Sequence, residues 1–272
     1  MYPESFSEQL MYSTVRLVAS NGNTGTGFFI SFELDHVHVP ILVTNKHVVN
    51  NNPSEVVFCE VHTGEYNKNE IDEISQTIKL DNGWRFHPTQ DLCYHYMNPL
   101  IMQVNKQLNR KVIFYYIQEE NLITKSELES LNAIEPVIMV GYPTGLWNEK
   151  HNFPLFRTGI TASHPAVDFN EVGIGVVDMA CFPGSSGSPI FISDDNGYVD
   201  KRGTIHVGYH RNKLLGVLFE GPVMDIEGKI IVKPQSHMIS KSWMMINLGY
   251  YIRSEELLVF KDMIIEDLKA GL

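Results

Sequence analysis

The stretch CFPGSSGSPIF, residues 181–191, places Ser186 between glycines and ahead of a proline and an apolar strand. A free serine hydroxyl is a poor nucleophile, so a catalytic serine needs an adjacent base and a cradle for the oxyanion that it creates. The glycines permit a tight turn in which backbone N–H groups come close enough to form that cradle. Taken alone, the pattern also fits an ordinary Gly/Ser loop between strands.

Two segments further upstream favour the catalytic interpretation. The first, LVTNKHVV at residues 42–49, carries His47 at the end of an apolar strand, and the second, PTQDL at residues 88–92, carries Asp91 before another strand. Histidine, aspartate and serine in this order form one of the known chain orders of a catalytic triad. We therefore predict that Ser186 is the nucleophile, His47 its base and Asp91 the residue that orients the base. A core histidine and a turn-capping aspartate are the structural alternatives.

These motifs resemble those of trypsin-like (chymotrypsin-fold) serine proteases, nearest to the bacterial HtrA/Deg-type protease domains. The matching segments are GTGFFI at 25–30, TNKHVV at 44–49, DL at 91–92, DMACFPGSSGSP at 178–189 and LGVLFEG at 215–221. The resemblance runs in order from about residue 10 to residue 258. It implies an all-β fold of two packed six-stranded antiparallel β-barrels with a C-terminal helix.

We expect a single protease domain over residues 1–272, without the PDZ domain that HtrA-type enzymes usually carry. The N-terminal barrel is expected over about 8–115, the C-terminal barrel over about 116–252 and the helix over 253–272. Residues 97–135 form a longer connection than two packed barrels require, with an apolar segment at 112–117 and a helix that opens with a capping box at Thr124. Residues 229–232 are predicted as a strand of the second barrel.

The resemblance also implies where a substrate binds. The backbone N–H groups of Gly184 and Ser186 would form the oxyanion hole, and an extended substrate would pair with the backbone of Gly221. The primary pocket would involve Ala180, Cys181, Phe182, Phe219 and Glu220. Because Ala180 falls where a trypsin-type pocket carries an aspartate, a strong basic preference is not supported there. The apolar residues favour a small or medium side chain, whereas Glu220 would favour a basic one if it points into the cleft.

Composition narrows the range of partners. The net charge of −11 argues against a nucleic-acid-binding surface, because phosphate contacts need clustered Lys and Arg. The three cysteines form no disulfide framework, the N-terminus shows no signal peptide and no apolar run is long enough for a membrane helix, so we expect a cytoplasmic protein without membrane contact. His206 and His210 lie four residues apart on an expected strand, too far apart for one metal ion. We predict no metal and no cofactor.

One departure from the animal relatives bears on regulation. Ser185 stands where those enzymes have an aspartate that pairs with a newly cut N-terminus, and no activation sequence precedes the barrel. We therefore expect a protein that is active as made or regulated by a protein partner. Three hypotheses remain: an endopeptidase that cuts protein or peptide substrates, a non-catalytic module that binds a partner through its cleft, and a latent protease of a bacterial stress or phage-defence system.

Overall fold

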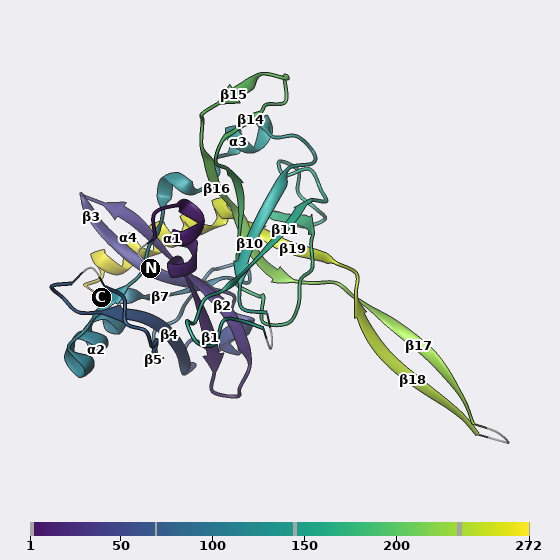
Figure 1. The fold of residues 1–272 in the computed structure, drawn as a ribbon, viewed down its shortest axis with the longest axis horizontal. Coiled ribbons are helices and arrows are strands. Elements are labelled where there is room, and N and C mark those ends of the chain that lie inside the picture. Colours follow the sequence, from purple (N-terminus) through teal and green to yellow (C-terminus); the bar gives the residue numbers. More distant parts are fainter. Residues whose placement is uncertain (1–2, 69, 144–145, 233–235, 272) are drawn as a thin grey trace.

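The computed structural model describes residues 3–68, 70–143, 146–232 and 236–271, and the side chains of residues 223–245 lie outside the description. Two β-rich halves lie against each other, and a long hairpin extends away from the C-terminal half (Figure 1). All-β architecture with a closed six-stranded barrel and a C-terminal helix is confirmed. The N-terminal half is a nine-stranded sheet, where a closed six-stranded barrel was expected.

The N-terminal sheet has the strand order β5-β4-β1-β2-β3-β7-β6, with β8 paired to β4 and β9 paired to β2. Its strands are β1 (Thr14–Ala19), β2 (Thr24–Leu34), β3 (Val37–Thr44), β4 (Val57–Gly64), β5 (Gln76–Leu80), β6 (Arg85–Phe86), β7 (Cys93–Tyr96), β8 (Lys111–Ile113) and β9 (Ile117–Gln118). The two short strands β8 and β9 come from the expected connection, so the chain after β7 adds short pairings to β4 and β2 and does not close a barrel.

The C-terminal half is the closed barrel, in the order β10-β11-β12-β19-β16-β13. Its strands are β10 (Pro136–Gly141), β11 (Leu155–Thr161), β12 (Ile174–Asp178), β13 (Pro189–Asp194), β16 (Arg211–Glu220) and β19 (Leu248–Arg253). Two hairpins lie outside the barrel, β14 (Gly197–Val199) with β15 (Ile205–Val207), and β17 (Val223–Val232) with β18 (Ser236–Met245). Residues 229–232 therefore belong to the projecting hairpin, and their assignment to the barrel was wrong.

Three apolar clusters explain why these strands pack as they do. One lies against the N-terminal sheet, one belongs to the closed barrel, and the third joins residues of the two halves. Strand β2 contributes to two of these clusters, because successive side chains of a strand point to opposite faces of the sheet. Phe28 and Ile30 belong to the cluster that joins the two halves, whereas Phe29 belongs to the cluster of the N-terminal sheet. Full burial of such a side chain stabilises the fold by about 1.5–3 kcal/mol.

Helices cover the ends of this β core. They are α1 (Phe6–Ser13), α2 (Met97–Leu108), α3 (Lys125–Ser130) and α4 (Leu258–Lys269), with short 3₁₀ turns at η1 (His47–Val49), η2 (Glu119–Asn121) and η3 (Ser254–Leu257). The predicted helix at Thr124 is confirmed as α3, with its capping box to Glu127. Helix α2 was not expected, although Met97, Leu100 and Val104 form its buried face at helical spacing.

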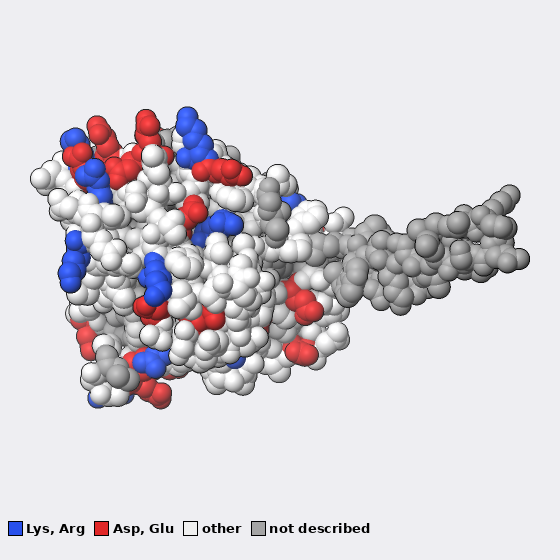
Figure 2. Space-filling model, turned by 90° about the horizontal axis from the view of Figure 1, so that it is seen from below, with Lys and Arg blue, Asp and Glu red and all other residues white. Residues whose placement is uncertain are grey.

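The surface carries charges of both signs. On the face shown in Figure 2, acidic and basic side chains are scattered among other residues and do not gather into one broad basic patch. In the described ranges every helix is too short or too polar to cross a membrane. Cys59, Cys93 and Cys181 are all buried and unpaired by disulfides.

Candidate active site

His47 and Asp91 meet because they follow and precede two paired strands. His47 begins η1 just after β3, Asp91 lies just before β7, and the register places Thr44 opposite Cys93. The His47 imidazole Nδ1 lies 2.6 Å from Asp91 Oδ2, and the His47 backbone N–H donates to Asp91 Oδ1 over 3.2 Å. With Nδ1–H donated to the carboxylate, Nε2 of His47 is left as the acceptor nitrogen, which is what a general base needs.

A buried histidine fixes the turn that presents Asp91. His87 Nδ1 accepts hydrogen bonds from the backbone N–H groups of Thr89 (3.2 Å) and Gln90 (2.9 Å). The backbone N–H of His87 donates to the Leu92 carbonyl oxygen. Burial lowers the pKa of His87, which keeps Nδ1 free to accept both bonds. Its Nε2 lies 3.6 Å from the Glu256 carboxylate at the start of the C-terminal helical segment. Sequence reasoning found no role for this histidine.

The Ser186 loop has the backbone shape that an oxyanion hole requires. Gly184 and Gly187 have φ values of 88° and 85°, and Ser185 N–H donates to Phe182 O over 3.0 Å. In the described part of the chain, the N–H groups of Gly184 and Ser186 donate no hydrogen bond. Two N–H groups next to Ser186, those of the residues expected to form the oxyanion hole, are therefore free to bind an oxygen atom.

Thr26 on strand β2 ties this loop to the N-terminal sheet. Its N–H donates to Ser186 O (2.8 Å), its Oγ1 donates to Gly184 O (3.0 Å), and its own carbonyl accepts from Thr44 Oγ1 (2.7 Å). The Thr26 hydroxyl also accepts from the backbone N–H of Tyr142 over 3.0 Å. One residue of the GTG segment thus holds the Ser186 loop beside the strand that leads to His47. The sequence signal was the motif itself, whose threonine had no assigned role.

The candidate nucleophile Ser186 and the candidate base His47 are not joined by a hydrogen bond among the described residues. The Ser186 hydroxyl donates instead to Phe219 O over 3.4 Å. Hydrogen bonds of a catalytic site are often long in the absence of substrate and tighten when substrate binds.

The candidate substrate-binding residues separate into two groups. Cys181 is buried in the core of the closed barrel, where burial raises the pKa of its thiol to about 11, and Ala180 beside it is half-buried. A side chain at Gly249 would overlap with Cys181 Sγ, so little space remains there. Phe182 is exposed beneath the Arg157 guanidinium. These positions do not form an open apolar pocket around Cys181.

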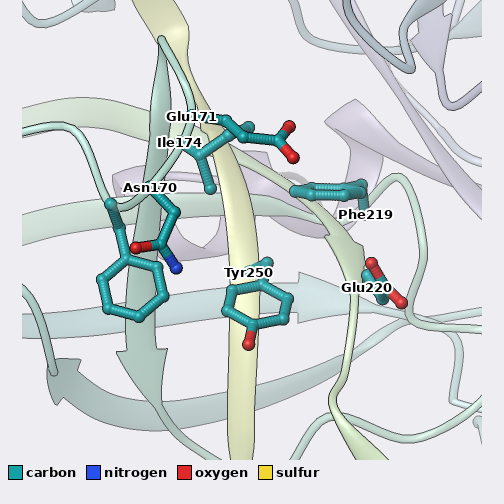
Figure 3. Close-up of a pocket in the computed structure, with 7 residues that line it drawn as sticks. Asn170, Glu171, Ile174, Phe219, Glu220 and Tyr250 are labelled. Atoms are coloured by element: carbon teal, nitrogen blue, oxygen red, sulfur yellow. The ribbon is translucent and has the colours of Figure 1, made fainter.

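The other group lies at the end of β16. Phe219 and Glu220 line a cavity together with Tyr250 of β19 (Figure 3), and Gly221 follows at the strand end, partly exposed. Among the described residues, no cluster of three or more His, Cys, Asp or Glu side chains is suited to a metal ion. His206 pairs instead with Asp200, at 3.1 Å, and stacks on Tyr198.

Residues 25–199 match the model of the trypsin-like peptidase domain family, which is more than half of the chain, so this protein belongs to that family. Two solved structures are similar in fold. One is a scabies mite inactivated protease paralogue, S-I1, with 10% identity, coverage of 95% of this chain and 97% of that chain, and a TM-score of 0.45. The other is described as HL collagenase, with 13% identity, coverage of 96% and 94%, and a TM-score of 0.45. No curated protein sequence matches this chain.

Proposed function

We propose that this protein is a serine endopeptidase that hydrolyses peptide bonds of protein substrates. The observation that carries the proposal is the 2.6 Å contact between His47 Nδ1 and Asp91 Oδ2, beside a serine loop with two unused N–H groups. An imidazole oriented by a carboxylate has its other nitrogen ready to take a proton from a serine hydroxyl. The family membership supports this reaction class.

The reaction would proceed through an acyl-enzyme. Ser186 Oγ attacks the scissile carbonyl carbon while its proton passes to His47 Nε2, and the N–H groups of Gly184 and Ser186 stabilise the oxyanion. His47 then gives that proton to the leaving amine as the C–N bond breaks, and Asp91 stabilises the imidazolium meanwhile. Water, activated by the same nitrogen, hydrolyses the ester and restores Ser186. The open edge of Phe219 to Gly221 would pair with an extended substrate.

The proposal includes a cytoplasmic location, which the three buried free cysteines support. The likeness to HtrA/Deg-type domains noted in the motifs stays part of the proposal as well. A second candidate function is a latent protease that a partner activates, in a bacterial stress or defence system. The Ser186 hydroxyl bonded to Phe219 O, and not to His47, favours this second candidate.

Fluorophosphonate labelling read by intact mass tests the proposal. We expect one adduct on the wild type, and none on Ser186→Ala or His47→Ala, because the reagent needs an activated serine. Ser130→Ala, which removes an exposed serine on α3, is the matched control and should label like the wild type.

Asp91→Asn should reduce the rate of peptide hydrolysis by about 10⁴-fold, because the His47 imidazole adopts the wrong tautomer.

Two outcomes would contradict the proposal that the purified protein is an active enzyme with Ser186 as its nucleophile. An adduct on Ser186→Ala as strong as on the wild type would show that another residue reacts. A folded wild type that gains no adduct would favour the latent or non-catalytic alternative, and the same assay repeated with candidate protein partners would then distinguish those two.

A further inference from the structure

A cavity of about 260 Å³ opens beside the candidate nucleophile, on the side of strand β16 (Figure 3). The cavity is lined by Phe219 and Glu220 at the end of β16, Tyr250 of β19, the segment 169–171 ahead of β12 and buried Ile174. Phe219 joins the cavity to the catalytic centre, because its carbonyl oxygen is 3.4 Å from Ser186 Oγ. A substrate held at Ser186 would reach this cavity with a side chain close to the cut.

Aromatic rings form the walls. The Phe169 and Tyr250 rings have centroids 6.0 Å apart at an interplanar angle of 28°, and those of Phe219 and Tyr250 are 6.3 Å apart at 33°. The faces of such rings attract cations through their quadrupoles, and they also pack well against an aliphatic arm. Long basic side chains, which have an apolar stem and a charged head, combine both features.

Two carboxylates complete the lining. Glu171 and Glu220 are both exposed, and in the part of the chain that the structure describes neither forms an ion pair or a side-chain hydrogen bond. In the view of Figure 3, the Phe219 ring lies between the two carboxylates. No lysine or arginine belongs to the lining, so the negative charge of this rim has no counter-ion from the lining residues. An acidic substrate side chain would be repelled here.

We propose that this cavity is a specificity subsite for a lysine or arginine side chain of the substrate, located on the N-terminal side of the scissile bond. The stem would lie along the Phe219 and Tyr250 rings, and the charged head would lie beside the Glu171 or the Glu220 carboxylate, which flank the Phe219 ring. An extended substrate that runs antiparallel to β16 places its upstream residues toward Gly221, since Phe219 is the residue nearest Ser186. The proposal rests on the proposed endopeptidase function.

The test uses fluorogenic tetrapeptides in which each of the three residues upstream of the one at the cut is set in turn to Lys, Arg, Gln, Leu or Glu. The readout is the ratio of kcat/KM for Lys over Gln at the same position, because this ratio cancels general changes in activity. We expect a wild-type preference of about tenfold at one position, which decreases at high salt. The Glu171→Gln/Glu220→Gln double variant should lose the preference, and Glu171→Lys/Glu220→Lys should prefer Glu.

Glu129→Gln, an exposed glutamate on α3, is the matched control and should keep the wild-type ratio. An unchanged ratio in the double Gln variant would overturn the subsite. If the wild type shows no fluorophosphonate adduct, the proposed function fails, and the subsite is tested separately by the affinity of fluorescein-labelled Lys and Gln peptides for Ser186→Ala. Equal affinity of the two peptides would then exclude the subsite, and tighter binding of the Lys peptide would support it.

Discussion

At the scale of single residues, Gly187 shows how closely the Ser186 loop approaches the N-terminal sheet. Its φ of 85° lies in the left-handed region, and a Cβ there would overlap with the Thr26 carbonyl and lie 2.6 Å from Thr44 Oγ1. Gly22 has nearly the same φ, 87°, with nothing within 4 Å of a Cβ. The two glycines therefore separate the cost of backbone conformation from the cost of steric overlap.

We expect Gly22→Ala to lower the free energy of unfolding by about 1 kcal/mol, which is the cost of a left-handed alanine. Gly187→Ala should lower it by about 3 kcal/mol or more and should also slow fluorophosphonate labelling, because the loop must move away from Thr26. Urea denaturation of both variants, with the labelling rate measured alongside, makes the comparison. Equal losses of stability in the two variants would contradict the steric argument.

At the scale of elements, the β17–β18 hairpin is an insertion on a complete barrel. Its ten-residue strands, about 30 Å long, pair only with each other in the sheet arrangement of the described residues. Strands β16 and β19 already pair from Gly216 with Arg253 to Glu220 with Tyr250 before the hairpin departs. The barrel is therefore closed without it (Figure 1).

We expect that replacing residues 223–245 by an Asn-Gly turn leaves the melting temperature within about 4 °C of the wild type, a change of about 1 kcal/mol or less. The first pair of the hairpin, Val223 with Met245, brings the two ends close enough for such a turn. Differential scanning calorimetry measures the change. A chain that no longer folds after the excision would show that the hairpin is part of the folding unit.

Sequence patterns predicted helix α3 correctly and did not predict α1 or α2. The capping box at Thr124 predicted α3, and the same pattern at Ser5 and Glu8 caps α1. Helix α1 was not expected, because the apolar residues that follow this second box also fit a strand, and β1 begins at Thr14 directly after the helix. For α2 the buried stripe is narrow, and Pro99 within its first turn makes the segment look like a loop although proline is tolerated there.

At the scale of the whole molecule, His62 links acid stability to the packing of the two halves. It lies on β4, and its ring contacts Tyr12 of α1 (4.8 Å between centroids) and Phe153 just before β11 (5.2 Å). Burial is the main cause that lowers its pKa to about 4. The folded state therefore binds a proton on His62 at a lower pH than the unfolded chain, in which a histidine has a pKa near 6.5.

Because the pKa of His62 is lower in the folded state than in the unfolded state, the free energy of unfolding decreases as the pH falls. The contribution of His62 to stability is complete above pH about 6.5. It decreases as the pH falls, because only the unfolded state binds the proton, and the full loss of about 3 kcal/mol is reached near pH 4. His87, whose pKa burial also lowers, adds to the loss in the same direction. We expect His62→Phe, which keeps a ring between Tyr12 and Phe153, to flatten the decrease between pH 6.5 and 4 in urea denaturation. An unchanged slope would contradict this origin.

Short motifs such as HVV, DL and GSSGSP were enough to predict the all-β architecture and the closed C-terminal barrel, through the family resemblance that they carry, and to identify three candidate triad residues. They could not show that Thr26 holds Gly184 across 158 positions, or that His87 supports the Asp91 turn and faces Glu256. Nor could they show that Cys181 is packed into the core while Phe219, Glu220 and Tyr250 enclose a cavity with residues of the preceding loop. These features were decided by tertiary packing, because each depends on which distant side chains the closed barrel and the sheet bring into contact.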